Sequence, residues 1–485
     1  MSPWEQIISR LVAVPPSGVY DRHMLRNYQL VSVQKMKDTL KPGNPSGIIL
    51  ALEPGAGKTV SLLTAARDLL DEGAIAKVLI IAPLLVANTV WHAEIEEWEH
   101  LKHTTYSICT GTEKQRIAAL AKDVEVYIIN KDILPWLWDY LGRGDRWRFD
   151  FVGIDEASML KNGKKRTKLK KLTRFGVLAA ARKHMKAVVE LTGTPSPNGL
   201  VNLWGLSYIA DQGERLGRTK TAFLNRWFDT SRYTYEVKAK PHAEAEILNM
   251  MKDIMFSLDP KDYAELPPLV ENVIKVQLPP KVMDEYRRFK RTLVSEAYNV
   301  EAVNAAVLTN KLCQFANGSI FREDGNDVWI HDCKLDALEN LHNEVAGTPM
   351  LVAYSYSFDK RRIQTRFPKA VVLNEVPDVM QTVRDWNAGK IDMLLAHPAS
   401  AGHGLNIQKG SNISCWYGLN ADLELFQQFN KRLHRPGQKG DVVWSHRIVA
   451  SGTHDESILP ILSDKKAVQD RVFEATRLIL RDYAA

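Results

Sequence analysis

Residues 46–59 read SGIILALEPGAGKT, and this stretch decides the fold. Its first half is an unbroken apolar run, which is typical of a strand buried on both faces of a parallel sheet. Its second half is rich in glycine and leads into a helical pattern over 59–70. A strand, a glycine loop and a helix in this order bring backbone N–H groups and a helix N-terminus to one point, where an anion can bind. The stretch therefore predicts an α/β domain with a phosphate-binding loop.

The chemistry of this loop follows from its residue types. Lys58 would reach the β- and γ-phosphates of a nucleotide, and the Thr59 hydroxyl would hold Mg²⁺. The full pattern has a further glycine where Leu52 stands, so a tight turn with a surface lysine stays open as the alternative. The residues predicted to bind the nucleotide here are Gly55, Ala56, Gly57, Lys58 and Thr59.

The remaining buried runs alternate with helical patterns, which predicts a doubly wound α/β fold. In the first half these runs are 78–82, 124–129, 151–154 and 187–191, with helical patterns at 88–98 and 112–121. Mainly helical patterns follow, with one strand at 271–278, and five more buried runs come after 331: 350–353, 370–373, 393–396, 413–417 and 442–448. We therefore expect an α/β lobe over 1–205, a mainly helical insert over 206–330 and a second α/β lobe over 331–485.

The composition excludes several classes of protein. The chain has 485 residues, of which 45% are hydrophobic and 25% charged, so it is neither disordered nor fibrous. Its four cysteines are too few for a disulfide framework. The longest apolar run, 78–87, contains Pro83 and is too short to span a bilayer. We expect a cytoplasmic protein without a membrane segment; its formal net charge of +7 permits a polyanionic partner.

Two further motifs carry charge that suits phosphate chemistry. Asp155 and Glu156 directly follow a buried strand, where Asp155 can hold a metal ion and Glu156 can orient water. Arg432 and Arg435 are three residues apart, so on a helix they share one face and can clamp a γ-phosphate. A solvated strand end and an exposed basic helix are the respective alternatives.

Taken together and in this order, the motifs resemble those of superfamily 2 helicase-like (DEAD/DEAH-like) ATPases, and within them the Swi/Snf-type DNA translocases. The resemblance covers about 25–465. It implies two tandem RecA-like lobes, ATP and Mg²⁺ as ligands, and a site in which Gln29 contacts adenine. Lys58, Asp155 and Glu156 would act from the first lobe, and Gln428, Arg432 and Arg435 from the second.

The remaining motifs of this family also have counterparts. Residues 82–84 with Trp91 and Trp98 resemble motif Ia, which touches the nucleic-acid backbone; 191–195 resemble motif III, 354–356 fall at motif IV and 400–406 resemble motif V. Lys161-Asn162 and Thr453-His-Asp-Glu456 favour the Swi/Snf type. Pro54 and Ser158 depart from the family, which has Met and His there. The DNA contacts implied by the motifs are Pro83, Thr194, Ser400 and Gly402.

A basic run follows the acid pair. Of the fourteen residues 161–174, eight are Lys or Arg and none is acidic, which favours contact with phosphates over a solvated helix face. A second basic cluster at 287–291 stays open between DNA contact and surface charge. The DNA contacts predicted in the run are Lys161, Lys164, Lys165, Arg166 and Lys168.

The expected function is a DNA-dependent ATPase of bacterial or bacteriophage origin that translocates on double-stranded DNA, with single-stranded DNA as a second candidate partner. A strand-separating helicase is the first alternative, because Asp324-Gly325 precedes a short apolar run and can turn a hairpin. A nucleotide-switched DNA-binding protein is the second alternative. No metal site beyond nucleotide-bound Mg²⁺ is expected.

Overall fold

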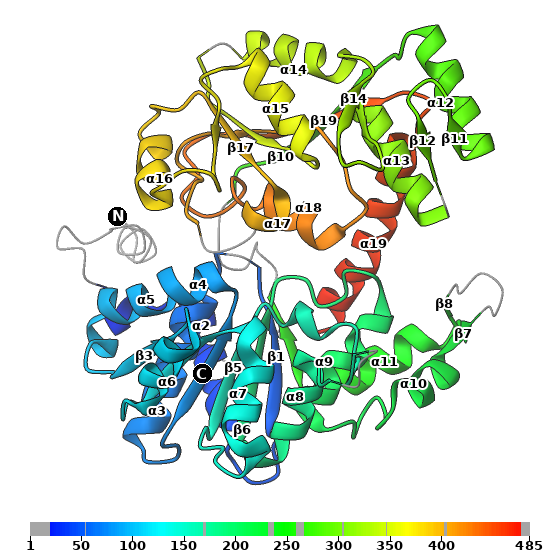
Figure 1. Cartoon of the computed structure of the whole chain (residues 1–485). Helices are drawn as coiled ribbons and strands as arrows, with labels where there is room; N and C mark the ends of the chain where they lie inside the picture. The colour runs from blue at the N-terminus through cyan, green and yellow to red at the C-terminus, as the bar shows by residue number, and fades with distance from the viewer. Residues whose placement is uncertain are drawn as a thin grey trace, which may run out of the picture. The chain divides into compact units, whose positions relative to one another are not determined.

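The computed structural model describes residues 20–53, 55–167, 171–230, 237–258, 266–302, 305–345, 347–401 and 405–476. The chain divides into two compact units, Met1–Tyr263 with Ala467–Ala485 as unit 1 and Ala264–Lys466 as unit 2. Each unit contains one large parallel sheet with helices around it (Figure 1). The α/β class predicted from the sequence is thus confirmed.

The sheet of unit 1 has seven strands in the order β3-β4-β2-β5-β6-β1-β9, and every pairing in it is parallel. All four buried runs predicted in this half form strands. The strands are β1 (Gly47–Ala51), β2 (Val78–Ala82), β3 (Tyr106–Cys109), β4 (Val126–Asn130), β5 (Phe151–Asp155), β6 (Ala187–Thr192) and β9 (Met255–Ser257).

Helices cover both faces of this sheet, because alternate strand residues enter two separate cores. Ile49 packs into one core and Ile48 and Leu50 into the other, and all three are buried. The helices are α2 (Asn27–Asp38), α3 (Lys58–Asp71), α4 (Leu84–Thr89), α5 (Trp91–Glu97), α6 (Glu113–Ala121), α7 (Leu134–Tyr140), α8 (Arg174–Ala181), α9 (Leu203–Asp211), α10 (Lys220–Trp227) and α11 (Ala243–Met251). The single helix predicted over 88–98 is two helices, since the chain breaks between α4 and α5 at Val90.

The sheet of unit 2 has six parallel strands in the order β10-β19-β18-β15-β17-β16. The strands are β10 (Leu269–Val276), β15 (Met350–Ala353), β16 (Val371–Val372), β17 (Met393–Ala396), β18 (Ile413–Trp416) and β19 (Val443–Ala450). The helices are α12 (Pro280–Thr292), α13 (Ala305–Asn317), α14 (Cys333–Glu344), α15 (Ser357–Arg366), α16 (Val379–Asn387), α17 (Pro398–Ala401) and α18 (Leu423–Asn430). Helix α19 (Asp455–Ala475) begins in unit 2, and its last residues belong to unit 1.

The segment 206–330, expected as one helical insert, is shared between the units. Its strand β9 joins the first sheet beside β1, and its strand β10 joins the second beside β19. Three short hairpins also lie in it: β7 (Phe228–Thr230) with β8 (Val237–Ala239), β11 (Val294–Ser295) with β12 (Val300–Glu301), and β13 (Ser319–Phe321) with β14 (Asp327–Trp329). Among the residues described, no helix is both long and apolar enough to cross a membrane.

Candidate nucleotide and nucleic-acid site

The register of the first sheet brings the predicted motifs to one edge. Ala51 at the end of β1 pairs with Thr192 at the end of β6, and Asp155 at the end of β5 pairs with Leu191. The glycine loop, the acid pair and the segment around Thr194 therefore all leave the sheet at its carboxyl edge, where open α/β sheets bind their ligands.

The glycine loop begins helix α3 with a backbone that suits an anion. Gly55 has φ of 88° and Gly57, the N-cap of α3, has φ of 70°, a region that glycine enters without a steric penalty. The Lys58 ammonium donates to the carbonyl oxygens of Leu52 and Glu53, at 2.8 and 3.2 Å. Lys58 is thus folded over its own loop. The departure at Pro54 lies outside the described residues.

Gln29 lies directly against this loop. Its Oε1 accepts a hydrogen bond from the backbone N–H of Arg26 at 2.8 Å, and its side chain is buried. A Cβ atom built on Gly57 would come within 2.0 Å of Gln29 Nε2. The residue predicted to contact adenine and the loop predicted to hold phosphates are therefore neighbours. Bare glycine backbone at a helix N-terminus, a lysine and a carboxylate at the same sheet edge fit a nucleotide with its magnesium ion.

The acid pair has a strained backbone. Glu156 is not a glycine, yet it has φ of 54° and ψ of 55°, and its N–H donates to Asp155 Oδ1 at 3.0 Å. Such a left-handed residue costs on the order of 1–3 kcal/mol and is concentrated at functional sites. Burial and the Glu156 carboxylate raise the pKa of Asp155 above its usual range, whereas the Lys58 ammonium acts in the opposite direction. The lysine and both acids thus share one electrostatic environment.

Trp91 is a residue of this site whose role the sequence did not indicate. Its side chain is fully buried, which excludes direct contact of the indole with nucleic acid, and it lies close enough to lower the pKa of Asp155. Trp91 is the first residue of α5, which follows β2 and α4 in the chain. Strand β2 is the neighbour of β5, the strand that ends at Asp155. Pro83 and Thr194 are also buried, so the structure offers no exposed surface on them for the predicted DNA contact.

Most described residues of the basic run, 161–167 and 171–173, lie in the segments that precede α8, and Arg174 begins that helix. Arg166 and Leu172 make an antiparallel bridge, and the Thr167 N–H donates to the carbonyl of Lys171 at 2.7 Å. Two close packings fix the loop: a Cβ on Gly163 would lie 2.4 Å from the Trp204 ring, and one on Gly176 would lie 1.9 Å from the Lys165 carbonyl oxygen. Lys164, Lys165 and Arg166 are exposed, Lys161 is half-buried, and Lys168 lies outside the described residues.

The predicted arginine pair in unit 2 differs from expectation. Helix α18 ends at Asn430, so Arg432 and Arg435 lie in the turns that follow and share no helix face. Both guanidinium groups nevertheless converge on one acceptor, because each donates to the Leu405 carbonyl, at 3.2 and 3.5 Å. Burial lowers the pKa of Arg435 from its ordinary value.

The other predicted residues of unit 2 are only partly described. Gln428 is buried on α18, and its amide donates to Glu424 at 3.5 Å. Ser400 is in α17, and Gly402 lies outside the described residues. Within the described part of the chain, no group of three or more His, Cys, Asp or Glu side chains is placed to hold a metal ion, and the four cysteines are free.

Comparison with known proteins identifies the family. The profile of the SNF2-related domain matches residues 28–322. The chain belongs to the SNF2-related family. Membership implies a helicase-like core that hydrolyses ATP, and it agrees with the two α/β sheets as tandem RecA-like lobes.

Individual relatives extend this finding. The chain is 39% identical over 466 residues to "Putative protein p41" of Acyrthosiphon pisum secondary endosymbiont phage 1, covering 93% of this chain and 98% of that protein. It is 22% identical to "Transcription regulatory protein SNF2" of Saccharomyces cerevisiae, covering 93% of this chain and only 28% of the yeast protein. It is 24% identical to an "Uncharacterized ATP-dependent helicase" of Mycoplasma pneumoniae, covering 91% of this chain and 41% of that one. The phage relative agrees with the expected bacterial or phage origin.

A solved structure is also similar. It is titled "Sulfolobus solfataricus SWI2/SNF2 ATPase core in complex with dsDNA", with 19% identity, coverage of 93% of both chains and a TM-score of 0.43.

Proposed function

We propose that this chain is a DNA-dependent ATPase that translocates along double-stranded DNA in the cytoplasm of a bacterial cell. The observation that carries the proposal is the course of the chain after β5. The strand ends at Asp155, Glu156 follows it directly, and within ten residues of Glu156 the chain exposes the basic side chains of Lys164, Lys165 and Arg166. Groups suited to nucleotide hydrolysis and groups suited to a phosphate backbone are therefore joined by one short, well-packed segment.

In the nucleotide site, each residue has a defined task. Gln29 would recognise the base, the N–H groups of 55–59 would cradle the phosphates, and Lys58 would neutralise their charge. Thr59 and Asp155 would hold Mg²⁺, and Glu156 would orient the attacking water. We assign Arg432, Arg435 and Gln428 to the same reaction from the second lobe, since guanidinium groups stabilise charge that develops on a transferred phosphoryl group. Phosphoryl transfer depends mainly on such positioning and charge neutralisation.

The DNA contact is assigned to the basic loop because its cations are exposed and the loop itself is anchored. Lys165 Nζ donates to Tyr208 Oη at 2.9 Å and stands 4.5 Å from the centroid of that ring. Lys164 and Arg166 flank it on the surface. Cations on a fixed loop neutralise phosphates without reading sequence, which suits a motor that must act at any site on the duplex.

Strand separation is the second candidate, favoured by one observation. The β13–β14 hairpin exists, as Asp324-Gly325 suggested, and it carries Trp329 with 62% of its surface exposed. An aromatic side chain on a hairpin can act as a wedge between base pairs. However, the turn of this hairpin contains Glu323 and Asp324, and acidic groups repel the DNA backbone. We therefore favour translocation without unwinding.

Two assays with the same protein distinguish these functions. Displacement of a third strand from a triplex reports movement along an intact duplex, and release of a labelled strand from a forked duplex reports unwinding. We expect ATP-dependent triplex displacement without strand release from the fork. Strand release without triplex displacement would contradict the translocase proposal and favour a helicase. In that case, Trp329→Ala should abolish strand release from the fork.

A further inference from the structure

Strand β10 forms an edge of the second sheet. Within the described part of the chain it pairs only with β19, in a parallel register that runs from Leu269↔Val443 to Val276↔Ala450. Its eight residues are all exposed or half-buried. One side of this long strand therefore presents backbone N–H and C=O groups to which a further strand can bind.

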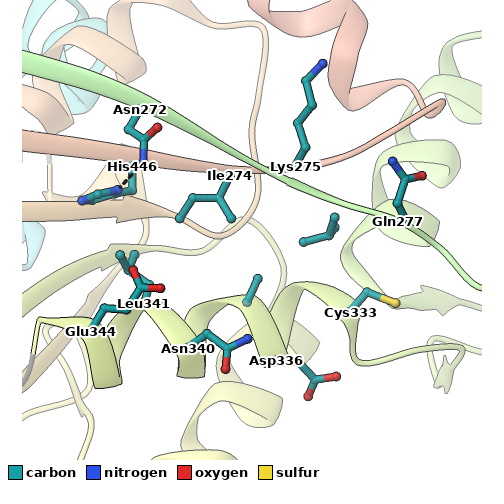
Figure 2. A pocket seen from close by; sticks show the side chains of 12 residues that line it. Asn272, Ile274, Lys275, Gln277, Cys333, Asp336, Asn340, Leu341, Glu344 and His446 are labelled. Carbon is teal, nitrogen blue, oxygen red and sulfur yellow. Dashed lines mark hydrogen bonds between the residues drawn. The ribbon is translucent and has the colours of Figure 1, made fainter.

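A groove with polar ends lies beside this strand. It has a volume of about 540 Å³ and runs between β10 and α14. Figure 2 shows the side chain of Ile274 on β10 between the two elements, and Leu341 and Ala337 of α14 also line the groove. Its size is that of a site for a small ligand or a large side chain. The middle of the groove is thus apolar and open.

One end of the groove is rich in hydrogen-bond acceptors. Asn272 Nδ2 and His446 Nδ1 are 3.2 Å apart, and since the amide nitrogen can only donate, the Asn272 carbonyl oxygen is left as an acceptor. Glu344 on the last turn of α14 stands at the same end, exposed and without an ion-pair partner among the described residues (Figure 2). A carboxylate and an amide oxygen together suit a planar cation with several donors.

The other charges of the groove do not neutralise this end. Lys275 points away from α14 in Figure 2, and its ammonium lies 3.7 Å from Glu456. Asp336 lies at the opposite end and pairs with Arg366 at 3.2 Å. The charge at the Asn272 end is therefore that of Glu344.

We propose that β10 is a docking site for an extended segment of a partner protein, which adds to the sheet as a further strand and places an arginine in the groove. Main-chain hydrogen bonds to β10 give the affinity, and alternate side chains of the added strand enter the groove. The arginine stem lies over Ile274 and Leu341, and its guanidinium group donates to Glu344 and Asn272. In the added strand, the residues two positions before and after the arginine face the same way as the arginine. Because Ile274, Ala337 and Leu341 make the middle of the groove apolar, these two residues are apolar as well.

The experiment uses the full chain and a synthetic peptide, acetyl-Thr-Val-Thr-Arg-Thr-Val-Thr-amide, with a fluorescent label. Binding is measured by anisotropy, and backbone hydrogen exchange shows where the peptide docks. We expect saturable binding with new protection confined to β10 and its flanks. Replacing the peptide arginine by glutamate should weaken binding at least tenfold, and methylating alternate peptide nitrogens should abolish it.

A pair of variants tests the predicted contact. Glu344→Gln should weaken binding severalfold, whereas Glu339→Gln, on the same helix but paired with Arg366, should leave it unchanged. Neither residue belongs to the nucleotide site, so ATP turnover serves as the control for folding. Absence of binding at millimolar peptide, protection outside β10, or equal affinity of the arginine and glutamate peptides would each overturn the proposal.

Discussion

Gln29 Nε2 occupies the space that a side chain on Gly57 would need, since a Cβ atom there would lie 2.0 Å away. Two segments that are almost thirty residues apart in the sequence are thus fitted to each other at the start of α3. The residue that we propose to recognise the base and the loop that we propose to hold the phosphates form one surface, so a change in either should affect the binding of the whole nucleotide.

Gly57→Ala tests this fit. The methyl group would collide with Gln29 and would also hold alanine at φ of 70°, which costs on the order of 1 kcal/mol or more. We expect at least tenfold weaker ATP binding, measured by calorimetry. Gly43→Ala is the matched control, because Gly43 has φ of 83° and no atom within 4 Å of its added Cβ. Equal ATP affinity of the two variants would show that the fit to Gln29 is unimportant.

The basic loop is tested by salt dependence. Changing Lys164, Lys165 and Arg166 to glutamine should weaken binding of duplex DNA at all sequences alike. The slope of log affinity against log salt should become shallower by about 0.9 for each phosphate that the protein no longer neutralises. Changing Arg287 and Arg288 on α12 is the comparison, because these cations already lie 3.6 and 3.2 Å from Asp284 and Glu296. An unchanged slope in the loop variant would show that the basic run is a solvated surface that does not contact DNA phosphates.

A buried ion pair in unit 2 predicts a large stability effect. Lys334 and Asp455 are 0% and 1% exposed, their charged atoms are 2.5 Å apart, and Lys334 also donates to Asn317 at 2.8 Å. Lys334→Met would leave the buried Asp455 carboxylate without its cation, so the free energy of unfolding of unit 2 should fall by about 3–5 kcal/mol in urea titrations. Removing Lys102 from its exposed pair with Glu99 should cost less than about 1 kcal/mol. Equal losses of unfolding free energy in the Lys334 and Lys102 variants would contradict the prediction that the buried pair contributes more to stability.

His331 predicts a pH dependence of stability. Its ring nitrogen Nε2 lies 3.0 Å from the Phe315 carbonyl oxygen, which can only accept, so Nε2 carries the proton of the neutral ring. Burial lowers the pKa of His331 to about 4. In the unfolded chain, histidine has a pKa of about 6.5. Between these values the unfolded state binds a proton that the native state does not, so stability is lost as the pH falls from 6.5 towards 4.

The variant His331→Gln should remove this contribution. The difference in unfolding free energy between wild type and variant should then decrease as the pH falls, by up to about 1.4 kcal/mol per pH unit. Parallel stability curves for the two proteins over pH 4 to 6.5 would contradict the assignment.

The sequence predicts most of the strands because a parallel sheet buries them on both faces. β2, β15 and β17 begin and end where their apolar runs do. The expected shared helix face of Arg432 and Arg435 is wrong, since a spacing of three implies such a face only if the helix continues, and α18 ends at Asn430. The sequence also does not predict that residues 206–330 are divided between the two units, because the partner of a short strand such as β9 is set by tertiary packing.

Side-chain surroundings are the other part that could not be predicted. Trp91 lies in a segment that resembles a motif expected to touch nucleic acid, yet its side chain is buried near Asp155. No periodicity distinguishes these two environments for one tryptophan. The strained backbone of Glu156 was equally hidden, because a single left-handed residue leaves no mark on the pattern of apolar residues.

The central claim is tested most directly by ATP turnover of the purified chain with duplex DNA, single-stranded DNA, RNA or no nucleic acid. We predict strong stimulation by the duplex. Lys58→Ala and Glu156→Gln, both correctly folded, should lower this turnover at least about 100-fold, with ATP binding retained by Glu156→Gln. Turnover that is the same with and without duplex DNA, or that persists in either variant, would contradict the account.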